Sequence, residues 1–305
     1  TPIPYVLPPV IDRQVIFGAS NLVQQNEQSL AIYTCNLKDG DARAVFRNLN
    51  MDMRTYGHLK MFVHGEAAGD FEDLKHGDLN VFVRLGSDYN KNFYEYEVPL
   101  QVTPWGATDP WMIWPQLNYV DIDFEVLKSI KLERDRAIQA NPNLSRIDRY
   151  RKIVDGKEIS VVGSPNLGNV RTVMIGIRNP KKLSPQDPDD GQPKCAEVWV
   201  NELRLTDFDE RGGWAANARV TAKLADFANI SVSGNTSTIG FGSLDQSVTE
   251  RNKFEAMAYD LQSNFEIGKF FPQETGIRIP LFFGYSEEWK NPMFNPLDPD
   301  IEFDD

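Results

Sequence analysis

Three segments in the last third of the chain, residues 214–223, 257–267 and 277–285, alternate between apolar and polar residues. Successive side chains of a strand point to opposite faces, so each segment predicts a strand with one apolar wall and one polar wall. Each segment is also about as long as a tilted strand that crosses a bilayer. With their neighbours they predict strands over residues 214–223, 229–236, 254–267 and 277–285.

The alternation divides these strands into two sets of positions. If the strands cross a membrane, the apolar positions form a lipid-facing set: Ala218, Val220, Ala222, Tyr259, Leu261, Phe265, Ile267, Ile279, Leu281 and Phe283. The polar positions then form a lumen-facing set: Arg219, Thr221, Lys223, Asp260, Gln262 and Glu266. A soluble antiparallel sheet with one solvated face shows the same alternation, so the pattern alone leaves both interpretations open.

The part before these strands has a different organisation. Residues 1–12 are rich in proline and predict an extended linker, and residues 13–207 predict a jelly-roll or galactose-binding-like β-sandwich. Its expected strands are residues 29–37, 59–64, 79–85, 93–100, 170–178 and 196–205. The fold class is therefore mainly β, with a sandwich domain followed by barrel strands and loops over residues 208–305.

One amphipathic helix interrupts the predicted sandwich. Residues 124–140 place apolar side chains at helical spacing with charged residues opposite. Asp121 or Asp123 is the expected N-cap, and Asn141 followed by Pro142 ends the helix.

Composition narrows the possible functions. The chain has 305 residues and is 41% hydrophobic, but no apolar run approaches the roughly 20 residues of a spanning helix. The net charge of −12 argues against a nucleic-acid partner, because phosphate binding needs a basic face. Cys35 and Cys195 lie in strand-like segments; two buried thiols are the simpler interpretation, and a disulfide stays open.

Motifs for catalysis or metal binding are weak. The histidines His58, His64 and His76 belong to no nucleophile elbow, HExxH or CxxC pattern, so we expect no enzyme activity, no cofactor and no metal. Two acidic clusters lack the ligand pattern of a calcium loop and are expected to be solvated. They comprise Asp187, Asp189 and Asp190, and Asp298, Asp300, Asp304 and Asp305.

An aromatic cluster is a candidate partner contact. Trp105, Trp111 and Trp114 lie among prolines between predicted strands. The rings either pack a rigid loop onto the sandwich or stack on sugar rings or a partner chain. The second possibility makes a surface carbohydrate- or protein-binding module the alternative function.

Several long strings of the sequence carry a family resemblance. They are residues 51–64 (MDMRTYGHLKMFVH), 84–88 (RLGSD), 93–100 (FYEYEVPL), 196–209 (AEVWVNELRLTDFD), 224–232 (LADFANISV) and 295–300 (NPLDPD). In these strings the chain resembles the SprA/Sov family, the giant outer-membrane translocon of the Bacteroidetes type IX secretion system. The resemblance implies a fragment of a very large transmembrane β-barrel with an inserted soluble domain.

The resemblance also implies a function and partners. Proteins of this family export folded cargo, including adhesins in gliding species, and act as conduits without catalytic residues. The implied partners are secreted cargo proteins, outer-membrane lipid and other secretion components such as a PorV-like barrel and a plug protein. The alternating strands then look like membrane strands of an outer-membrane protein.

Turn lengths predict which side of the membrane the sandwich occupies. Residues 224–228 and 271–276 predict short turns, whereas residues 237–252 and 287–305 predict long loops. Outer-membrane barrels keep short turns on the periplasmic side. We therefore expect the sandwich on the extracellular side, with Trp214 in one interfacial aromatic girdle and Phe270 and Phe271 in the other.

Overall fold

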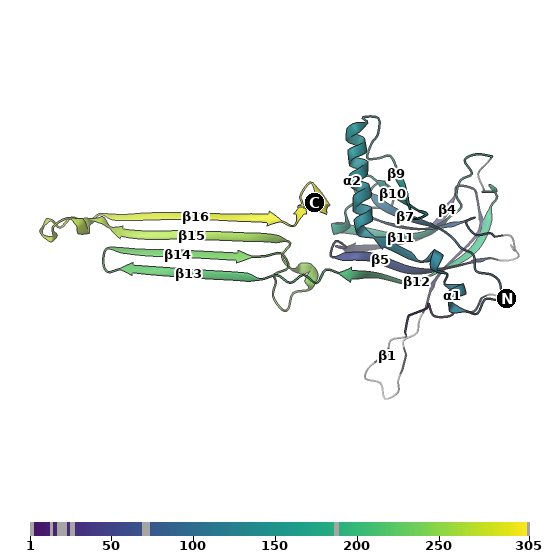
Figure 1. The fold of residues 1–305 in the computed structure, drawn as a ribbon, viewed down its shortest axis with the longest axis horizontal. Coiled ribbons are helices and arrows are strands. Elements are labelled where there is room, and N and C mark those ends of the chain that lie inside the picture. The colour runs from purple at the N-terminus through teal and green to yellow at the C-terminus, as the bar shows by residue number, and fades with distance from the viewer. Residues whose placement is uncertain are drawn as a thin grey trace. The chain divides into compact units, whose positions relative to one another are not determined.

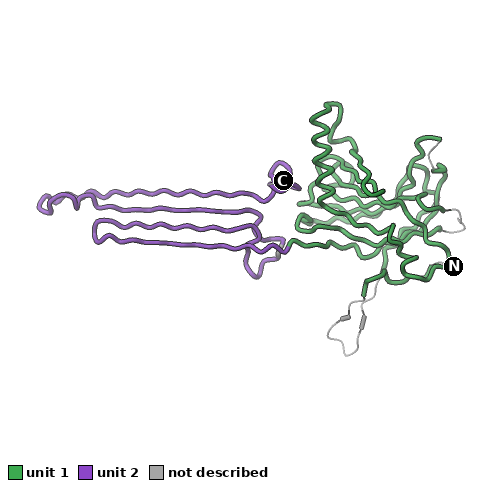
Figure 2. The backbone as a smooth tube through the Cα atoms, viewed as in Figure 1, with its two compact units in different colours: residues 1–209 green, residues 210–305 purple. Residues whose placement is uncertain are grey.

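The structure, a computed structural model, describes residues 3–12, 15–16, 23–24, 28–68, 74–185 and 189–303. The chain divides into two compact units, residues 1–209 and residues 210–305 (Figure 2). Every strand pairing in both units is antiparallel, and the predicted mainly β fold is confirmed (Figure 1).

The first unit contains two large sheets (Figure 1). The six-stranded sheet has the order β4 (Ala42–Met51), β11 (Val170–Arg178), β6 (Asn80–Gly86), β7 (Phe93–Pro99), β10 (Lys157–Val162) and β9 (Tyr150–Val154). The four-stranded sheet has the order β3 (Leu30–Leu37), β12 (Lys194–Phe208), β5 (Tyr56–Ala67) and β8 (Val120–Asp123). A short separate pair joins β1 (Val15–Ile16) and β2 (Val23–Gln24).

One hydrophobic core lies between the two large sheets. Alternate residues of β6, such as Val81 and Val83, and of β12, such as Val198 and Val200, belong to the same buried cluster. Alternate side chains of a strand point to the same face, so the side chains on the inner faces of the two sheets form the core of a sandwich.

The predicted helix is α2 (Phe124–Ala140), and its bounds are confirmed. The Asp123 carboxylate accepts a hydrogen bond from the backbone N–H of Glu125, and Asn141 is the C-cap. Phe124, Leu127 and Ile130 join the sandwich core, because their spacing places them on one helix face. The remaining helical turns are α1 (Pro110–Ile113), η1 (Gln116–Asn118) and η2 (Leu167–Asn169).

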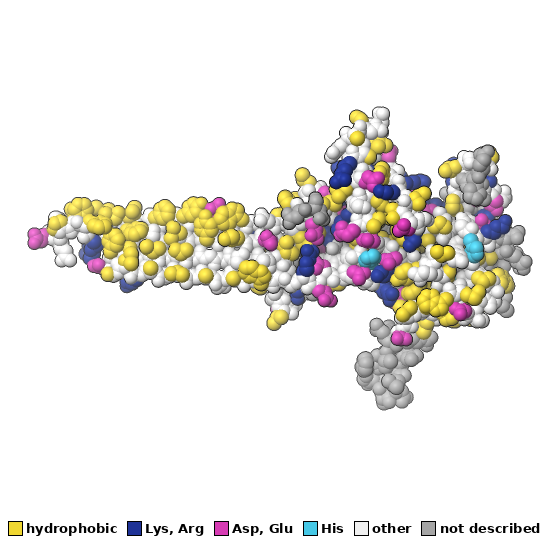
Figure 3. Space-filling view, in the orientation of Figure 1, with side chains coloured by type: hydrophobic (Ala, Val, Ile, Leu, Met, Phe, Trp, Pro, Cys, Tyr) yellow, Lys and Arg dark blue, Asp and Glu magenta, His cyan; other side chains and the backbone are white. Residues whose placement is uncertain are grey.

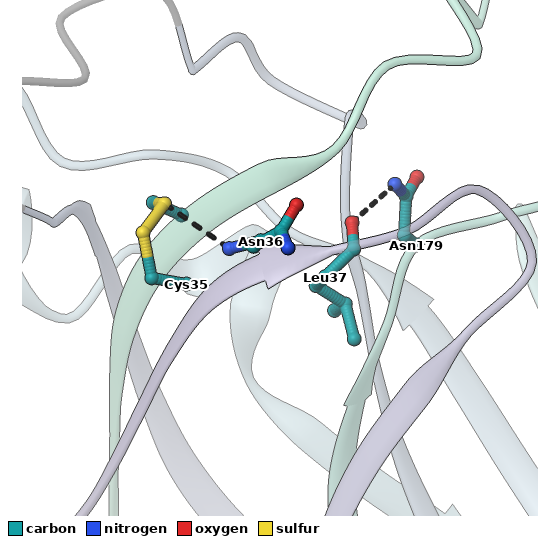
Figure 4. Close-up of a disulfide and its surroundings, with 5 residues drawn as sticks. Cys35, Asn36, Leu37 and Asn179 are labelled. Atoms are coloured by element: carbon teal, nitrogen blue, oxygen red, sulfur yellow. Dashed lines mark hydrogen bonds between the residues drawn. A yellow bond between two sulfur atoms is a disulfide. The ribbon is translucent and has the colours of Figure 1, made fainter.

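A disulfide joins Cys35 and Cys195 and links β3 to β12 (Figure 4). The backbone N–H of Asn36 donates a hydrogen bond to Sγ of Cys195 over 3.3 Å. Nearby, the buried Asn179 amide donates to the Leu37 carbonyl over 3.0 Å (Figure 4). The interpretation of two free thiols was therefore wrong, because the register of β3 and β12 brings the two cysteines together.

A network of charges lies on the face of the six-stranded sheet that turns away from the core. The Glu95 carboxylate on β7 has 1% of its side chain exposed and pairs with Arg84, Arg149 and Arg178. Arg178 also binds Glu97, which accepts a hydrogen bond from Asn80 over 2.7 Å. A buried carboxylate needs such partners, since an unpaired buried charge is costly.

The N-terminal segment packs against the sandwich of the first unit. Ile3 is buried with Phe62, Trp114 and Trp199, and the Tyr5 hydroxyl accepts a hydrogen bond from the Asn201 side chain over 2.7 Å. The described residues 3–12 are therefore held by side-chain packing as well as by the chain connection.

The second unit is one open sheet of four sequential strands. They are β13 (Ala215–Leu224), β14 (Ala228–Ser237), β15 (Phe254–Glu266) and β16 (Pro280–Pro292). A small pair, β17 (Phe294–Asn295) and β18 (Asp298–Glu302), follows them. Short helical turns η3 (Val248–Glu250), η4 (Ile267–Phe270) and η5 (Gln273–Thr275) occupy the connections.

The last strand and its turn differ from the prediction. β16 runs from Pro280 to Pro292, so the predicted strand over residues 277–285 was placed too early. The connection from β15 spans residues 267–279 and holds η4 and η5, so the short turn predicted at 271–276 is part of a longer segment. The turn between β13 and β14 is short, as predicted, and uses residues 225–227.

Candidate functional site

The register of β13–β16 separates apolar from polar side chains. Directly opposite residues of an antiparallel pair point to the same face. One cross-strand row therefore holds Val220, Val232, Leu261 and Tyr285, and the adjacent row on this face holds Ala222, Ile230, Ser263 and Phe283. The row nearest the short turn holds Leu224, Ala228, Phe265 and Leu281. We call this surface the apolar face.

Eight of the ten residues predicted to face lipid lie on the apolar face. They are Ala218, Val220, Ala222, Tyr259, Leu261, Phe265, Leu281 and Phe283. The other two, Ile267 and Ile279, lie beyond the strand ends, in the connection between β15 and β16. The Ile267 backbone N–H donates to the Ile279 carbonyl over 2.9 Å, so these two residues continue the pairing of the hairpin.

The opposite surface, which we call the polar face, carries the whole predicted lumen-facing set. Its rows hold Arg219, Thr221, Lys223, Asp260, Gln262 and Glu266. Serine and asparagine side chains of β14, such as Ser231 and Asn235, stand between the charges. Phe282 interrupts this polar surface and is 64% exposed.

Neither face is covered by another element of the second unit within the described residues. Large apolar side chains are open to solvent, with Val220 67% exposed and Phe283 51% exposed. Figure 3 shows hydrophobic side chains spread over much of the sheet. A soluble protein rarely leaves such a contiguous surface open, so the apolar face is a candidate interaction surface.

The sheet also has two open edges. β13 and β16 each pair on one side only, among the described strands. Long edge strands with free backbone N–H and C=O groups invite further strand pairing.

An acidic residue surrounded by aromatic rings lies near one end of the apolar face. The Glu287 carboxylate accepts hydrogen bonds from the hydroxyls of Tyr259 over 2.7 Å and Tyr285 over 2.8 Å. The Tyr259 ring contacts the rings of Tyr285 and Trp289, with centroids 5.8 Å and 5.3 Å apart. The sequence interpretation missed this cluster, although Tyr285, Glu287 and Trp289 continue the two-residue period of the strand.

The three tryptophans of the candidate partner contact have different environments. Trp105 and Trp111 are 56% and 57% exposed, whereas Trp114 is 2% exposed. The Trp114 indole N–H donates to the Val6 carbonyl over 3.0 Å, so this ring packs the N-terminal segment onto the sandwich. We therefore restrict the candidate contact to Trp105 and Trp111, because a buried ring cannot stack on a ligand.

A cavity of about 660 Å³ lies beside the exposed tryptophans. Its lining combines apolar groups with the polar side chains of Lys75, His76 and Gln101. The pairing of exposed rings with polar groups suits a small ligand or a partner side chain.

His58, His64 and Asp190 have protein partners, and Asp300, which was expected to be solvated, is buried. The Asp121 carboxylate lies 2.7 Å from Nδ1 of His58. His64 is buried, and this burial lowers the pKa of its imidazole to about 4. The Lys194 ammonium lies 2.8 Å from Asp78 and 2.7 Å from Asp190, so a lysine occupies the cation position at that loop. Asp187, Asp304 and Asp305 are outside the described residues. Within the described ranges, no three His, Cys, Asp or Glu side chains are grouped to hold a metal ion.

Among the described residues, every helix is too short or too polar to span a membrane. A search of proteins of curated function found no match to the chain. A model of the family described as motility related/secretion protein, SprA_N, matches residues 1–305. The match covers both units, the sandwich and the strands of the open sheet, so the chain belongs to the SprA_N family of motility related/secretion proteins.

Proposed function

We propose that this chain forms part of the wall of an outer-membrane protein-conducting translocon of type IX secretion, with β13–β16 as membrane strands. The observation that carries the proposal is a single-layer sheet with one apolar face, one polar face and two open edges. Membership of a secretion and motility family supports the same role.

The apolar face fits lipid as its cover. Lipid covers a sheet from outside without a second protein layer, and alternate side chains then face the interior. The open edges of β13 and β16 need neighbouring strands, because unpaired backbone groups are not tolerated in hydrocarbon. The four strands are thus proposed to be one sector of a larger closed wall.

The polar face fits a conduit for folded cargo, including adhesins in motile species. It mixes both charge signs, with Arg219 in the cross-strand row of Asp260 and Lys223 in the row of Asn264, among uncharged serine and asparagine side chains. Such a surface offers little apolar area for a passing protein to bind. In this role the chain guides cargo and catalyses no reaction.

Labelling of single cysteines in the native outer membrane tests the proposal. A cysteine at Val220 or Leu281 is expected to react with a lipid-dissolved photoreagent and to resist a water-soluble maleimide. A cysteine at Thr221 or Gln262, both on the polar face, is expected to show the reverse. Equal reaction of both pairs with the water-soluble maleimide would contradict the membrane wall.

A second function rests on a separate observation in the first unit. Trp105 and Trp111 expose their rings beside the cavity of about 660 Å³. This arrangement favours a surface module that binds carbohydrate or protein. Binding to a glycan array that disappears in the double variant Trp105→Ala and Trp111→Ala would support it; an unchanged profile would remove it.

We also propose that the first unit lies on the extracellular side. The short turn 225–227 and the long segment 238–253 lie at opposite ends of β14, and outer-membrane barrels keep short turns on the periplasmic side. β13 then begins at the cell surface, where the first unit joins it.

A further inference from the structure

The aromatic cluster around Glu287 has a feature that the proposed wall does not explain. A carboxylate on a surface that faces lipid is costly unless it lies at the level of the headgroups. Glu287 stands on the apolar face, in the cross-strand row of Ala218, Gly234 and Tyr259. The row beyond it holds Met257 and Trp289.

The position of Glu287 along β16 agrees with the headgroup level. Ile279 marks the end of the apolar stretch nearest the turn, and Glu287 lies eight residues after it. Eight residues of extended strand measure about 27 Å. At a tilt of about 40° this length spans about 20 Å of membrane, close to the apolar band of about 25 Å in outer-membrane barrels. Tyr259, Tyr285 and Trp289 are the residue types that populate this interface.

Among the described strands of the sheet, no basic side chain shares the face of the Glu287 carboxylate. The basic side chains of the four strands are Arg219, Lys223 and Lys290, and the register places all three on the polar face. Lys290 pairs there with Glu288, with 2.8 Å between Nζ and Oε1. Among the described residues of the sheet, Glu287 thus accepts hydrogen bonds from two neutral tyrosine hydroxyls, which leave its negative charge unbalanced.

The surrounding groups suit an ammonium ion. The two hydroxyls fix the carboxylate, and an ionised carboxylate has further lone pairs to accept hydrogen bonds. The Tyr259 ring contacts the rings of Tyr285 and Trp289, and the ring faces of such residues attract cations. Tyr285 and Trp289 are 49% and 42% exposed, so a ligand can reach them from the lipid side.

We propose that Tyr259, Tyr285, Glu287 and Trp289 form a binding site for the ammonium headgroup of a phospholipid. The proposal rests on the proposed membrane wall and names a specific lipid contact on it. The site anchors the apolar face at one depth and holds β16 against the bilayer interface.

The test uses the complete translocon polypeptide, reconstituted in nanodiscs made of equal parts phosphatidylethanolamine and phosphatidylglycerol. Phosphatidylglycerol lacks the ammonium group. After gentle delipidation, the lipid retained by the protein is measured by native mass spectrometry. Wild-type protein is expected to retain phosphatidylethanolamine over phosphatidylglycerol, and Glu287→Gln to reduce this preference by about tenfold.

Glu288→Gln is the matched control, because it removes the same charge one residue away on the polar face. It is expected to keep the wild-type preference. Tyr259→Phe keeps the ring and removes one hydroxyl, so it is expected to reduce the preference severalfold without a change of charge.

The outcomes separate this site from the wall itself. If wild type, Glu287→Gln and Glu288→Gln all enter nanodiscs and show the same lipid preference, the headgroup site is overturned and the membrane wall is retained. Failure of the wild type to enter nanodiscs would overturn both. A photocrosslinker at Tyr285 that captures a protein and no lipid would also overturn the headgroup site.

Discussion

Cys35 on β3 and Cys195 on β12 are joined by a disulfide, although 160 residues separate them in the sequence. The bond closes a loop that contains most of the sandwich, and the long closed loop limits the unfolded chain more than the folded one. Disulfides persist in oxidising compartments, so the pair agrees with a protein of the cell envelope.

Loss of this disulfide is expected to destabilise the first unit. The double variant Cys35→Ser and Cys195→Ser should lower the free energy of unfolding by about 2–5 kcal/mol, since the loop constraint on the unfolded chain disappears. Urea unfolding followed by tryptophan fluorescence measures this change. Reduction of the wild type with dithiothreitol should reproduce it and should leave the double variant unaffected.

Acid should weaken the sandwich through Glu95. Burial raises the pKa of this carboxyl, but the guanidinium groups of Arg178, Arg149 and Arg84 outweigh it and lower the pKa to about 2. Because the folded pKa lies below the unfolded value of 4.5, the stability from Glu95 is complete above about pH 5. It is lost as the pH falls toward 2 and amounts to about 3 kcal/mol.

Glu97 has the opposite effect on the pH dependence of stability, because burial raises the pKa of its carboxyl. Its contribution changes at pH values above 4.5, whereas Glu95 and Asp88, whose pKa is also lowered to about 2, lose theirs below that value. Thermal unfolding at a series of pH values measures both. Glu95→Gln should flatten the profile below pH 4.5 and cost about 3–5 kcal/mol at pH 7, since Arg84 and Arg149 lose their carboxylate partner and Arg178 keeps only Glu97. A profile as steep as that of the wild type would contradict this assignment.

The sequence predicts the elements whose pattern is local. The stripe of Phe124, Leu127 and Ile130 with its capping Asp123 gave the bounds of α2, and the strict alternation after Trp214 gave β13 and β14. The predicted end of β16 was wrong, because Glu287 breaks the apolar pattern that Trp289 resumes on the same face.

Other elements lacked a clear pattern or depended on distant residues. β4 is exposed along most of its length, so it carries no buried stripe that alternation could reveal. The pair Asp155-Gly156 is typical of a two-residue hairpin turn and predicts the hairpin of β9 and β10. Both residues have positive φ angles. The disulfide and the Glu95 network depend on the register of strands far apart in sequence, which no local pattern determines.

Two tryptophans of the same loop region should differ in their effect on stability. Trp114→Ala removes a ring that is 2% exposed and packs against Ile3, Phe62 and Trp199, and should cost about 3–5 kcal/mol. Trp111→Ala removes an exposed ring and should change the free energy of unfolding by no more than about 0.5 kcal/mol. Chemical denaturation compares them; equal losses would assign Trp111 to the core.

A charge should be tolerated on only one face of β15. Leu261 shares a row with Val220, Val232 and Tyr285 on the apolar face, whereas Gln262 lies on the polar face. Leu261→Arg should cost about 1–2 kcal/mol in the membrane, because its row lies one step from the interfacial row of Glu287, and Gln262→Arg should cost little. The amount of heat-resistant protein in outer-membrane fractions measures this difference. Equal amounts for the two variants would favour a soluble sheet.

The proposed orientation makes a prediction for a tag in the first unit. Asp189 lies in the segment of the first unit that precedes β12. A protease-sensitive epitope tag at this position should be cleaved in intact cells, because the first unit is proposed to be extracellular. A tag in the turn 225–227, at the far end of β13, should be cleaved only after the outer membrane is permeabilised. Protection of the Asp189 tag until permeabilisation, together with cleavage in the turn, would reverse the orientation while retaining the membrane wall.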